Sequence, residues 1–220
     1  FFTEEDHTKR AARLFRLTVF GKTDPVLVYE ESDERFNLDI ERSRSGAYLF
    51  LSSGSHTTTE VRVLDADARE TDWVLVSPRR QDHEYELDHQ GDRFLIRTND
   101  QGRNFRLVEA PLDSPGETTW RELVPHRDDV MLEAVIALEQ DTVLYERSLG
   151  LPRFRSIRRD GSPGVDATFD EPTYTATPHN NHEFSTTTFR YAYQSLVTPP
   201  SVFDLDLKTG ESTLIKQTEM

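Results

Sequence analysis

Apolar and polar residues alternate in short segments along this chain, and similar segments return at regular spacing. The segment that begins at Tyr48 has counterparts beginning at Arg93, Thr142 and Phe189, at intervals of about 47 residues. A period of two, with many β-branched and aromatic residues, is typical of half-buried β-strands. The pattern therefore predicts a series of repeated β units.

Two more strand-like segments follow in each unit. The first set lies at residues 14–17, 60–63, 105–108, 153–156 and 201–204, and the second at residues 26–29, 74–76, 121–124, 165–168 and 212–215. A further strand is predicted before each turn-forming pair, at residues 36–42, 83–89 and 132–138, with a fourth, less regular one that ends at Phe184.

Four strands per unit predict an all-β fold, a segment of a β-propeller with four-stranded antiparallel blades. Another repetitive all-β arrangement is the alternative, whereas prolines such as Pro199 and Pro200 argue against helices. The predicted division is a partial blade at 1–31 and complete blades at about 32–78, 79–125, 126–170 and 171–217. A blade without its innermost strand leaves backbone groups unpaired, which predicts a longer parent chain, a partner or self-association through exposed blade edges.

The charge balance narrows the partners. There are 26 basic and 40 acidic residues, a net charge of −14, which opposes binding to nucleic acid or anionic membranes and favours cationic partners. Solubility alone is the competing explanation. The chain has no cysteine, no apolar run long enough to span a membrane and no signal peptide at Phe1, so a cytoplasmic protein is expected, one whose first residue is not a natural terminus.

No motif for catalysis, metal binding or cofactor binding is complete. The Gly-x-Ser-x-Gly string of α/β-hydrolases is missing, and its nearest approach, at residues 53–56, lacks the second glycine. His179 and His182 have no third ligand at zinc spacing. Asp65-Ala66-Asp67 and Asp204-Leu205-Asp206 lack the rest of a calcium loop. We therefore predict no metal, no cofactor and no catalytic residue within this chain.

Several strings resemble the propeller of the oligopeptidase B group in the prolyl oligopeptidase family. They cover nearly the whole chain and are weakest between Gly161 and His182. The strings are Val28-Tyr29-Glu30-Glu31, Arg35-Phe36-Asn37, His56-Thr57-Thr58 before Glu60-Val61, Gly91-Asp92-Arg93-Phe94, Thr98-Asn99-Asp100, Asn104-Phe105-Arg106-Leu107, Pro125-His126-Arg127-Asp128-Asp129-Val130-Met131-Leu132-Glu133, and Tyr193-Gln194-Ser195-Leu196-Val197-Thr198-Pro199-Pro200-Ser201-Val202.

The resemblance implies a seven-bladed parent propeller that caps an α/β-hydrolase domain with a Ser-Asp-His triad and admits only short peptides. It implies cleavage after basic residues, so the expected partners are the hydrolase domain of the same protein and short basic peptides. The hydrolase domain would lie outside these residues. The chain itself would be a non-catalytic gating cap, and a stand-alone propeller that binds a protein partner is the alternative function.

The resemblance also places the loops between second and third strands, and the connections between blades, toward the hydrolase domain. Residues there are candidates for lining the substrate cavity or holding the domain interface through charge-assisted hydrogen bonds, although for each one taken separately an ordinary polar loop residue is the favoured alternative. The candidates are Ser55, His56, Thr57, Arg79, His83, Asn99, Asp100, Arg103, His126, Arg127 and Asp129.

Overall fold

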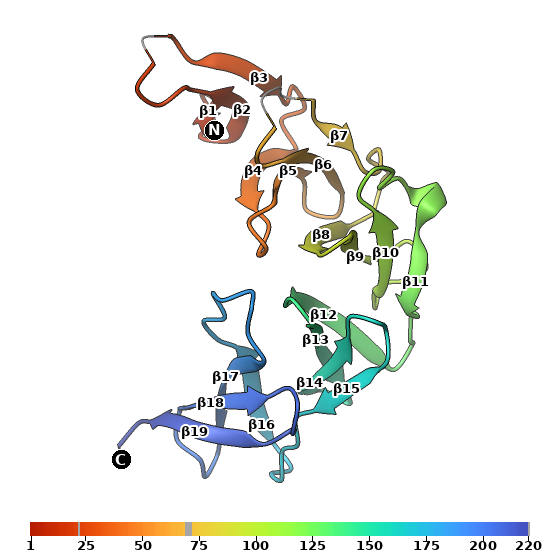
Figure 1. Cartoon of the computed structure of the whole chain (residues 1–220), viewed down its shortest axis with the longest axis vertical. Helices are drawn as coiled ribbons and strands as arrows, with labels where there is room; N and C mark the ends of the chain where they lie inside the picture. Colours follow the sequence, from red (N-terminus) through yellow and green to blue (C-terminus); the bar gives the residue numbers. More distant parts are fainter. Residues whose placement is uncertain (22, 69–71, 220) are drawn as a thin grey trace.

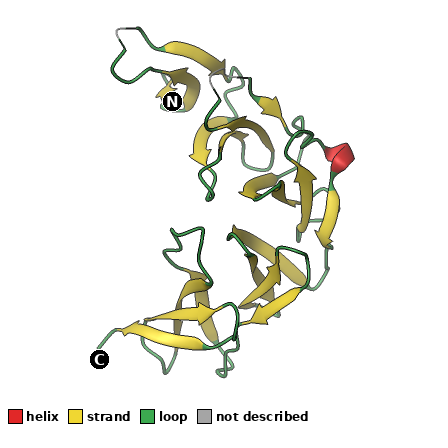
Figure 2. Cartoon of the chain, in the orientation of Figure 1, coloured by secondary structure: helices red, strands yellow, loops and turns green. Residues whose placement is uncertain are grey.

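Five antiparallel sheets follow one another along the chain and form an open arc (Figure 1). The structure, a computed structural model, describes residues 1–21, 23–68 and 72–219. Within these ranges one short 3-10 helix, η1 (Glu117–Thr119), accompanies the strands (Figure 2). The predicted fold class, an all-β segment of a propeller, is confirmed.

The first three sheets are called blades 1 to 3. Blade 1 has three strands and blades 2 and 3 have four each. Their bounds are β1 (Phe2–Glu5), β2 (Ala11–Arg16) and β3 (Val26–Glu30) in blade 1, β4 (Asn37–Arg42), β5 (Tyr48–Gly54), β6 (Thr59–Asp65) and β7 (Val74–Leu75) in blade 2, and β8 (Tyr85–Gln90), β9 (Arg93–Thr98), β10 (Arg106–Pro111) and β11 (Arg121–Val124) in blade 3.

Blades 4 and 5 complete the arc, again with four strands each. Blade 4 comprises β12 (Val130–Ala137), β13 (Asp141–Ser148), β14 (Leu151–Arg158) and β15 (Pro163–Asp166), and blade 5 comprises β16 (Tyr174–Pro178), β17 (Thr188–Ser195), β18 (Ser201–Asp206) and β19 (Ser212–Gln217).

Strands within each blade lie side by side in the order of the sequence. In Figure 1 the first strands β4, β8 and β12 line the concave side of the arc, and β7 and β11 lie on its outer edge. The first strand of each complete blade is therefore its innermost strand, next to the region that would become the central channel of a closed ring.

One strand prediction is wrong. The innermost strand of blade 5 is not a segment ending at Phe184 but β16, which pairs with β17 through Tyr174↔Ser195 and Pro178↔Tyr191. Residues 179–187 form a long loop instead. The Asn181 side chain holds this loop, because its Nδ2 donates to the Arg190 carbonyl (2.8 Å) and its Oδ1 accepts from the Arg190 amide (2.7 Å).

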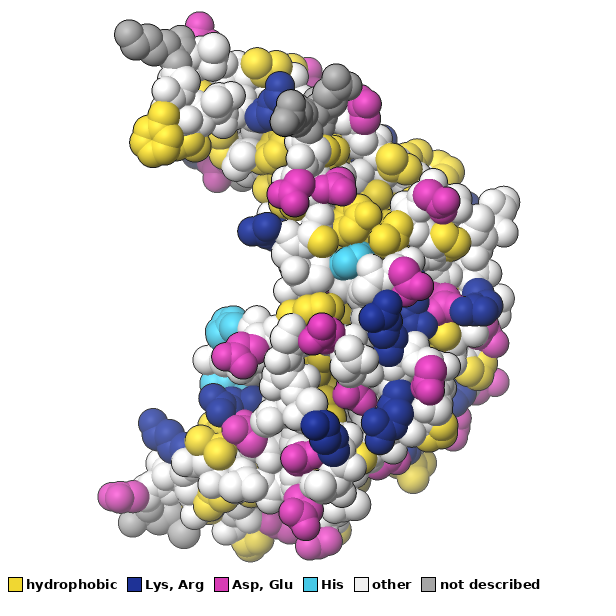
Figure 3. Space-filling model, viewed as in Figure 1, with side chains coloured by type: hydrophobic (Ala, Val, Ile, Leu, Met, Phe, Trp, Pro, Cys, Tyr) yellow, Lys and Arg dark blue, Asp and Glu magenta, His cyan; other side chains and the backbone are white. Residues whose placement is uncertain are grey.

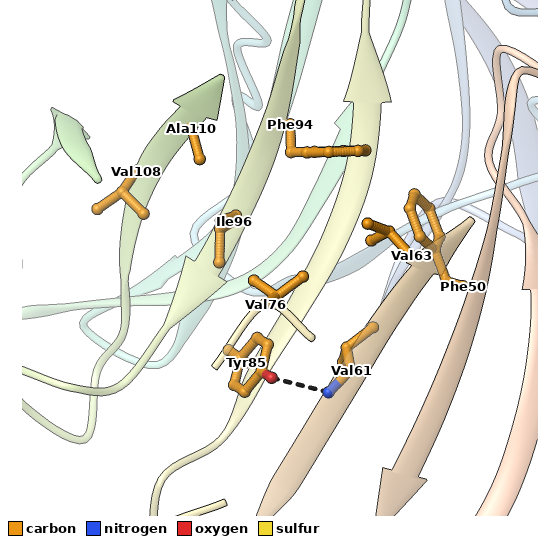
Figure 4. Close-up of a cluster of buried hydrophobic side chains, with 9 residues drawn as sticks. All are labelled: Phe50, Val61, Val63, Val76, Tyr85, Phe94, Ile96, Val108 and Ala110. Atoms are coloured by element: carbon orange, nitrogen blue, oxygen red, sulfur yellow. Dashed lines mark hydrogen bonds between the residues drawn. The ribbon is translucent and has the colours of Figure 1, made fainter. Parts of the chain in front are cut away.

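A separate apolar core fills each space between neighbouring blades. Between blades 2 and 3, Phe50 and Val61 pack with Phe94 and Ile96 (Figure 4). The Tyr85 hydroxyl completes this core by accepting from the Val61 amide and donating to the Ser77 carbonyl, both at 2.7 Å. Burial raises the pKa of Tyr85 to about 12, so the phenol stays neutral and acts as a cross-blade clamp.

The other cores differ in content. Leu14, Leu38 and Leu51 fill the space between blades 1 and 2. Blades 4 and 5 share an aromatic cluster in which Phe154 lies edge-on to Phe189, with ring centroids 4.9 Å apart. Sequential packing of this kind makes each blade dependent on its immediate neighbours.

Candidate cavity and domain-interface site

The sheet topology places all eleven predicted site residues on one flat face of the arc, at the end toward which the second and fourth strands of each blade run. In an antiparallel four-stranded blade, the loop after the second strand and the exit from the fourth strand lie at the same end. The β5–β6 and β9–β10 loops and the β7–β8 and β11–β12 connections are such segments. Their location fits the prediction, and their role remains a prediction.

A groove of about 460 Å³ lies at this end of blade 2. Four of the predicted residues line it, namely Ser55, His56, Thr57 and Arg79. The groove also takes in residues that the sequence did not single out, Arg35, Phe36, Thr58, Arg80 and Gln81. The structure therefore brings one third of the predicted set into a single concave site with three guanidinium groups.

Arg79 is the centre of this site. Its Nη2 donates to the Glu31 carboxylate and lies 3.2 Å from Ser53 Oγ, and its backbone amide donates to Glu60 Oε2 at 3.1 Å. The guanidinium also lies over the Phe36 ring, 4.0 Å from its centroid. Since these partners come from the end of blade 1 and from two strands of blade 2, Arg79 ties the first two blades together.

The partners of Arg79 are buried carboxylates. Glu31 is 5% exposed and Glu60 is 6% exposed. Burial alone would raise the pKa of Glu31, but hydrogen bonds from Arg79 and Ser53 outweigh it and lower the pKa below its usual value. Both carboxylates therefore stay ionised, and Arg79 is first a structural residue, with part of its guanidinium left facing the groove.

His83 and Asn99 belong to the framework beneath the site. His83 is 4% exposed, its Nε2 lies 3.0 Å from Thr98 Oγ1, and its ring stacks on Tyr85. Burial, and then the charge of Arg80, lower the pKa of His83. Asn99 Oδ1 accepts from the Glu84 amide at 2.9 Å. The two side chains fix the β9–β10 loop against the β7–β8 connection.

Asp100 and Arg103 lie further along the same loop. Asp100 receives two hydrogen bonds from Arg106, at 2.8 and 2.7 Å. Burial raises the pKa of Asp100, but Arg106 reverses the effect and the net pKa is lowered. Arg103 is exposed. Asp100 therefore holds the loop, and Arg103 offers a positive charge at its surface.

The three predicted residues of the β11–β12 connection have different surroundings. His126 packs so closely on Gly102 that a Cβ there would lie 2.3 Å from its Nε2. Arg127 donates to Glu146, a carboxylate with 0% exposure that also binds Arg155 at 2.7 Å. Asp129 is exposed at the surface. The His126 ring and the Arg127 carbonyl, which accepts from Asn104 Nδ2 at 2.8 Å, thus contact the β9–β10 loop, while the Arg127 guanidinium anchors blade 4.

The buried acceptors are what sequence reasoning missed. Glu31 and Glu60 pair with Arg79, and Glu146 pairs with Arg127, across 19 to 48 positions of sequence. Their only signal in the sequence is a glutamate inside or beside an otherwise apolar strand segment, as at Glu60-Val61 and Glu146 after Tyr145.

The opposite flat face of the arc carries a larger groove, about 880 Å³, between blades 3 and 4. Arg93, Arg121, Arg158 and Arg159 line it, and Figure 3 shows basic side chains gathered over β10, β11 and the β14–β15 turn. Glu109 binds both Arg93 and Arg121, and Asp92 binds Arg159 at 2.9 Å. Ion pairs therefore occupy much of this groove, which contains none of the predicted residues.

Residues 1–21, 23–68 and 72–219 contain neither a cluster of metal ligands nor a membrane-spanning helix. No group of three His, Cys, Asp or Glu side chains is arranged to hold a metal ion. No helix there has the length and apolar character needed to cross a membrane.

Residues 1–218 match the family described as prolyl oligopeptidase, N-terminal beta-propeller domain, and the chain belongs to that family. This agrees with the five-blade arc. The match leaves only the last two residues outside.

Relatives carry the same domain within a longer protein. The chain is 36% identical over 220 residues to dipeptidyl aminopeptidase BI of Pseudoxanthomonas mexicana and 30% identical over 217 residues to protease 2 of Moraxella lacunata. It covers 99% and 98% of itself in these matches but only 30% and 31% of the relatives. The chain thus spans about a third of the length of these peptidases.

Solved structures agree. Oligopeptidase B from Leishmania major superposes with a TM-score of 0.89 at 27% identity, covering 99% of this chain and 32% of that one. Oligopeptidase B from Trypanosoma brucei, in a closed form with covalently bound antipain, gives a TM-score of 0.88 at 26% identity, with the same coverage. The propeller is the N-terminal part of a larger peptidase in these proteins.

Proposed function

We propose that this chain is the substrate-gating cap of an oligopeptidase B-like serine peptidase that cleaves short peptides after basic residues in the cytoplasm. Its partners would be the α/β-hydrolase domain of the same protein and the cationic peptide. The end that holds the Arg79 groove would face the hydrolase domain. The family membership and the similarity to two oligopeptidase B structures support the peptidase part of this proposal.

The observation that carries the preference for cationic peptides is a set of carboxylates on two innermost strands, Asp39 and Glu41 on β4 and Glu86 and Asp88 on β8. Burial, followed by the negative charges of Asp39, Glu86 and Asp88, raises the pKa of Glu41. Arg97 pairs with Glu86 at 3.3 Å, and Arg42, Arg44 and Arg97 line the same groove as Glu41 and Glu86, so four carboxylates stand against three guanidinium groups. We expect a net negative potential at this wall of the channel.

At Asp88 burial, rather than repulsion, raises the pKa to about 6, although the backbone amides of His89 and Arg44 donate to its carboxylate. A cationic peptide side chain that approached this wall would relieve the repulsion. We therefore expect the channel wall of blades 2 and 3 to concentrate Lys- and Arg-containing peptides before they reach the hydrolase domain.

The test uses the full-length peptidase. Glu41→Gln combined with Glu86→Gln should lower kcat/KM for a blocked Arg-containing tripeptide amide several-fold at low ionic strength, mainly through KM. Added salt should shrink this difference, because steering by charge is screened within about 8 Å at 0.15 M ionic strength. Glu211→Gln, on the exposed β18–β19 turn, is the matched control and should leave kcat/KM unchanged.

One relative is named a dipeptidyl aminopeptidase, so the position of cleavage needs its own measurement. The full-length protein should be offered the blocked Arg-containing amide and a dipeptide amide with a free N-terminus. Preference for the blocked substrate supports the oligopeptidase B-like proposal. Cleavage of the free-amine dipeptide amide alone would replace it with removal of dipeptides.

A further inference from the structure

Three large apolar side chains are exposed to solvent on the flat face of the arc that holds the Arg79 groove. Leu149 is 96% exposed in the β13–β14 turn, and Leu196 and Val197 are 92% and 77% exposed in the β17–β18 loop. Both segments join second to third strands, like the loop of Ser55 and His56. Contiguous exposed apolar side chains on a soluble domain mark an interaction surface.

The two apolar loops are neighbours. The Tyr174 hydroxyl donates to the Pro152 carbonyl at 2.9 Å, just after the β13–β14 turn, and Tyr174 pairs in register with Ser195, just before Leu196. One side chain therefore bridges the bases of both loops. The three apolar residues therefore lie on neighbouring loops of blades 4 and 5, and we call them the apolar rim (Leu149, Leu196 and Val197).

The backbone at Leu149 argues against chance exposure. Ser148 pairs with Leu151, so Leu149 and Gly150 form a two-residue hairpin turn with φ of 50° and 82°. Turns with positive φ at both positions favour Asn-Gly, since a branched side chain is strained there. A leucine at this place is unfavourable for the turn and for solvation alike, which points to a contact made elsewhere.

The β17–β18 loop is fixed rather than frayed. Ser195 Oγ accepts from the amides of Val197 and Thr198, at 3.0 and 2.8 Å, and the Ser195 amide donates to the Thr198 carbonyl at 3.0 Å. Leu196 is thus held outward on a built loop. A preformed apolar projection costs little ordering on binding.

Blades 2 and 3 present a different surface at the same end. Their loops there carry Ser55, His56, Thr57, Asn99, Asp100 and Arg103, and the one large apolar residue among them, Phe105, is 7% exposed. This end of the arc is therefore divided into a polar half, with the Arg79 groove, and an apolar half. Interfaces bury apolar centres and leave polar margins solvated.

We propose that the apolar rim is the anchor on which the catalytic domain of the parent protein rests, while the polar half borders a solvated cavity. This inference rests on the proposed function. The occupant follows from chain length, because this domain covers about 30% of relatives whose remaining length must pack somewhere, and from continuity with the Arg79 groove. Contact over blades 4 and 5 alone would leave the side over blades 2 and 3 free to open for a peptide.

The test measures how accessible single thiols are in the full-length protein. This chain has no cysteine, so Leu149→Cys and Leu196→Cys each add one defined probe, with the unsubstituted protein as blank for thiols elsewhere. Phe20→Cys is the matched control, because Phe20 is fully exposed, also has positive φ (67°), and lies in the β2–β3 loop at the opposite end. His56→Cys reports on the polar half.

Maleimide labelling of Leu149→Cys and Leu196→Cys should be at least ten-fold slower than that of Phe20→Cys, and His56→Cys should react within about three-fold of the control. Equal rates at all four positions would overturn the inference, as would protection of His56→Cys alone. Protection that disappears on dilution would assign the rim to a second copy instead. Labelling does not depend on turnover, so an inactive protein with a protected rim would refute the proposed function and leave the interface standing.

Discussion

Arg44, in the β4–β5 turn, donates from its Nε to the carbonyl oxygen of Ala137 at 2.9 Å, across 93 positions of sequence. Its Nη2 donates to the Asn181 carbonyl in the β16–β17 loop. One side chain of blade 2 thereby reaches blades 4 and 5, whose loops face it across the concave side in Figure 1. The Arg44 guanidinium group is thus hydrogen-bonded to backbone carbonyl oxygens rather than to a carboxylate.

Loss of this cross-blade contact should be measurable as stability. Arg44→Met keeps the length of the side chain and removes its donors, so we expect the free energy of unfolding to fall by about 1–3 kcal/mol, as for hydrogen bonds from charged groups. Urea denaturation measures the change. Arg42→Met is the control, because Arg42 donates to the Gly46 carbonyl of its own hairpin, and should change stability by about 0.5 kcal/mol or less. Equal losses in both variants would contradict a cross-blade role.

The Glu31–Arg79 clasp should contribute more than a surface pair. Glu31→Gln leaves the Arg79 guanidinium beside Glu60 alone, and we expect a loss of about 2–3 kcal/mol, below the 3–5 kcal/mol of a fully buried pair because Arg79 is partly exposed. Arg35→Gln breaks the exposed pair with Asp33 and should cost about 0.5 kcal/mol or less. Thermal and urea unfolding of both variants decide the matter, and a cost for Glu31→Gln no larger than the control's would count against the clasp.

Asp88 predicts a pH dependence of stability. Its pKa is about 6 in the folded protein against 3.8 for the free group, so the folded state holds its proton more tightly. The free energy of unfolding should therefore fall, by up to about 3 kcal/mol from this group, as pH rises from about 4 to about 7. Asp88→Asn should remove that fall, which urea titrations at several pH values measure as the difference between the two proteins.

A control separates this effect from the rest of the charge. Asp92→Asn removes an exposed carboxylate whose pKa is lowered by Arg159, so its contribution has the opposite sign and is lost as pH falls. If Asp88→Asn and the unsubstituted protein kept a constant stability difference across the range, the assigned pKa of Asp88 would be wrong.

Two glycines offer a matched pair for backbone and contact effects. Gly91 has φ of 68° and an added Cβ would lie 2.1 Å from the Arg159 guanidinium, whereas Gly150 has φ of 82° and nothing within 4 Å. Gly150→Ala should cost about 1 kcal/mol for the backbone alone. Gly91→Ala should cost up to about 1 kcal/mol more, since Arg159 must leave its pair with Asp92. If Gly91→Ala and Gly150→Ala cost the same in an Arg159→Gln background, the extra cost of Gly91→Ala comes from its contact with Arg159. Unequal costs there would refute this explanation.

The strand repeat was readable because blade packing imposes the same alternation on every unit. Segments such as Arg93–Thr98 have apolar residues on both faces since neighbouring blades cover both, and turns such as Gly91-Asp92 mark the hairpins. β16 escaped prediction because Tyr174–Pro178 has few apolar residues and is followed by a long loop that broke the spacing. The loop depends on Asn181, whose partner Arg190 no local pattern reveals.

The site was predictable in position but not in pairing. Loop order within a blade fixes which end Ser55, Asn99 and Arg127 occupy. Which carboxylate meets Arg79 depends on the register of three strands, and with 30% charged residues the sequence offers many equal choices. His83 illustrates the limit, because its place in the connection between two blades made it a site candidate, whereas the structure buries its ring against Tyr85.

The unequal cores between blades set where the arc is mechanically weakest. The clusters between blades 2 and 3 and between blades 4 and 5 each contain nine buried apolar side chains among the described residues. Between blades 1 and 2 only three of the described apolar side chains are buried, Leu14, Leu38 and Leu51, and the residues packed against them are partly exposed. Apolar burial contributes roughly in proportion to area. Under mechanical load, blade 1 should therefore separate from blade 2 first, at an interface where the Glu31–Arg79 ion pair supplements a small apolar core. Blades 2 to 5 should stay together at that load.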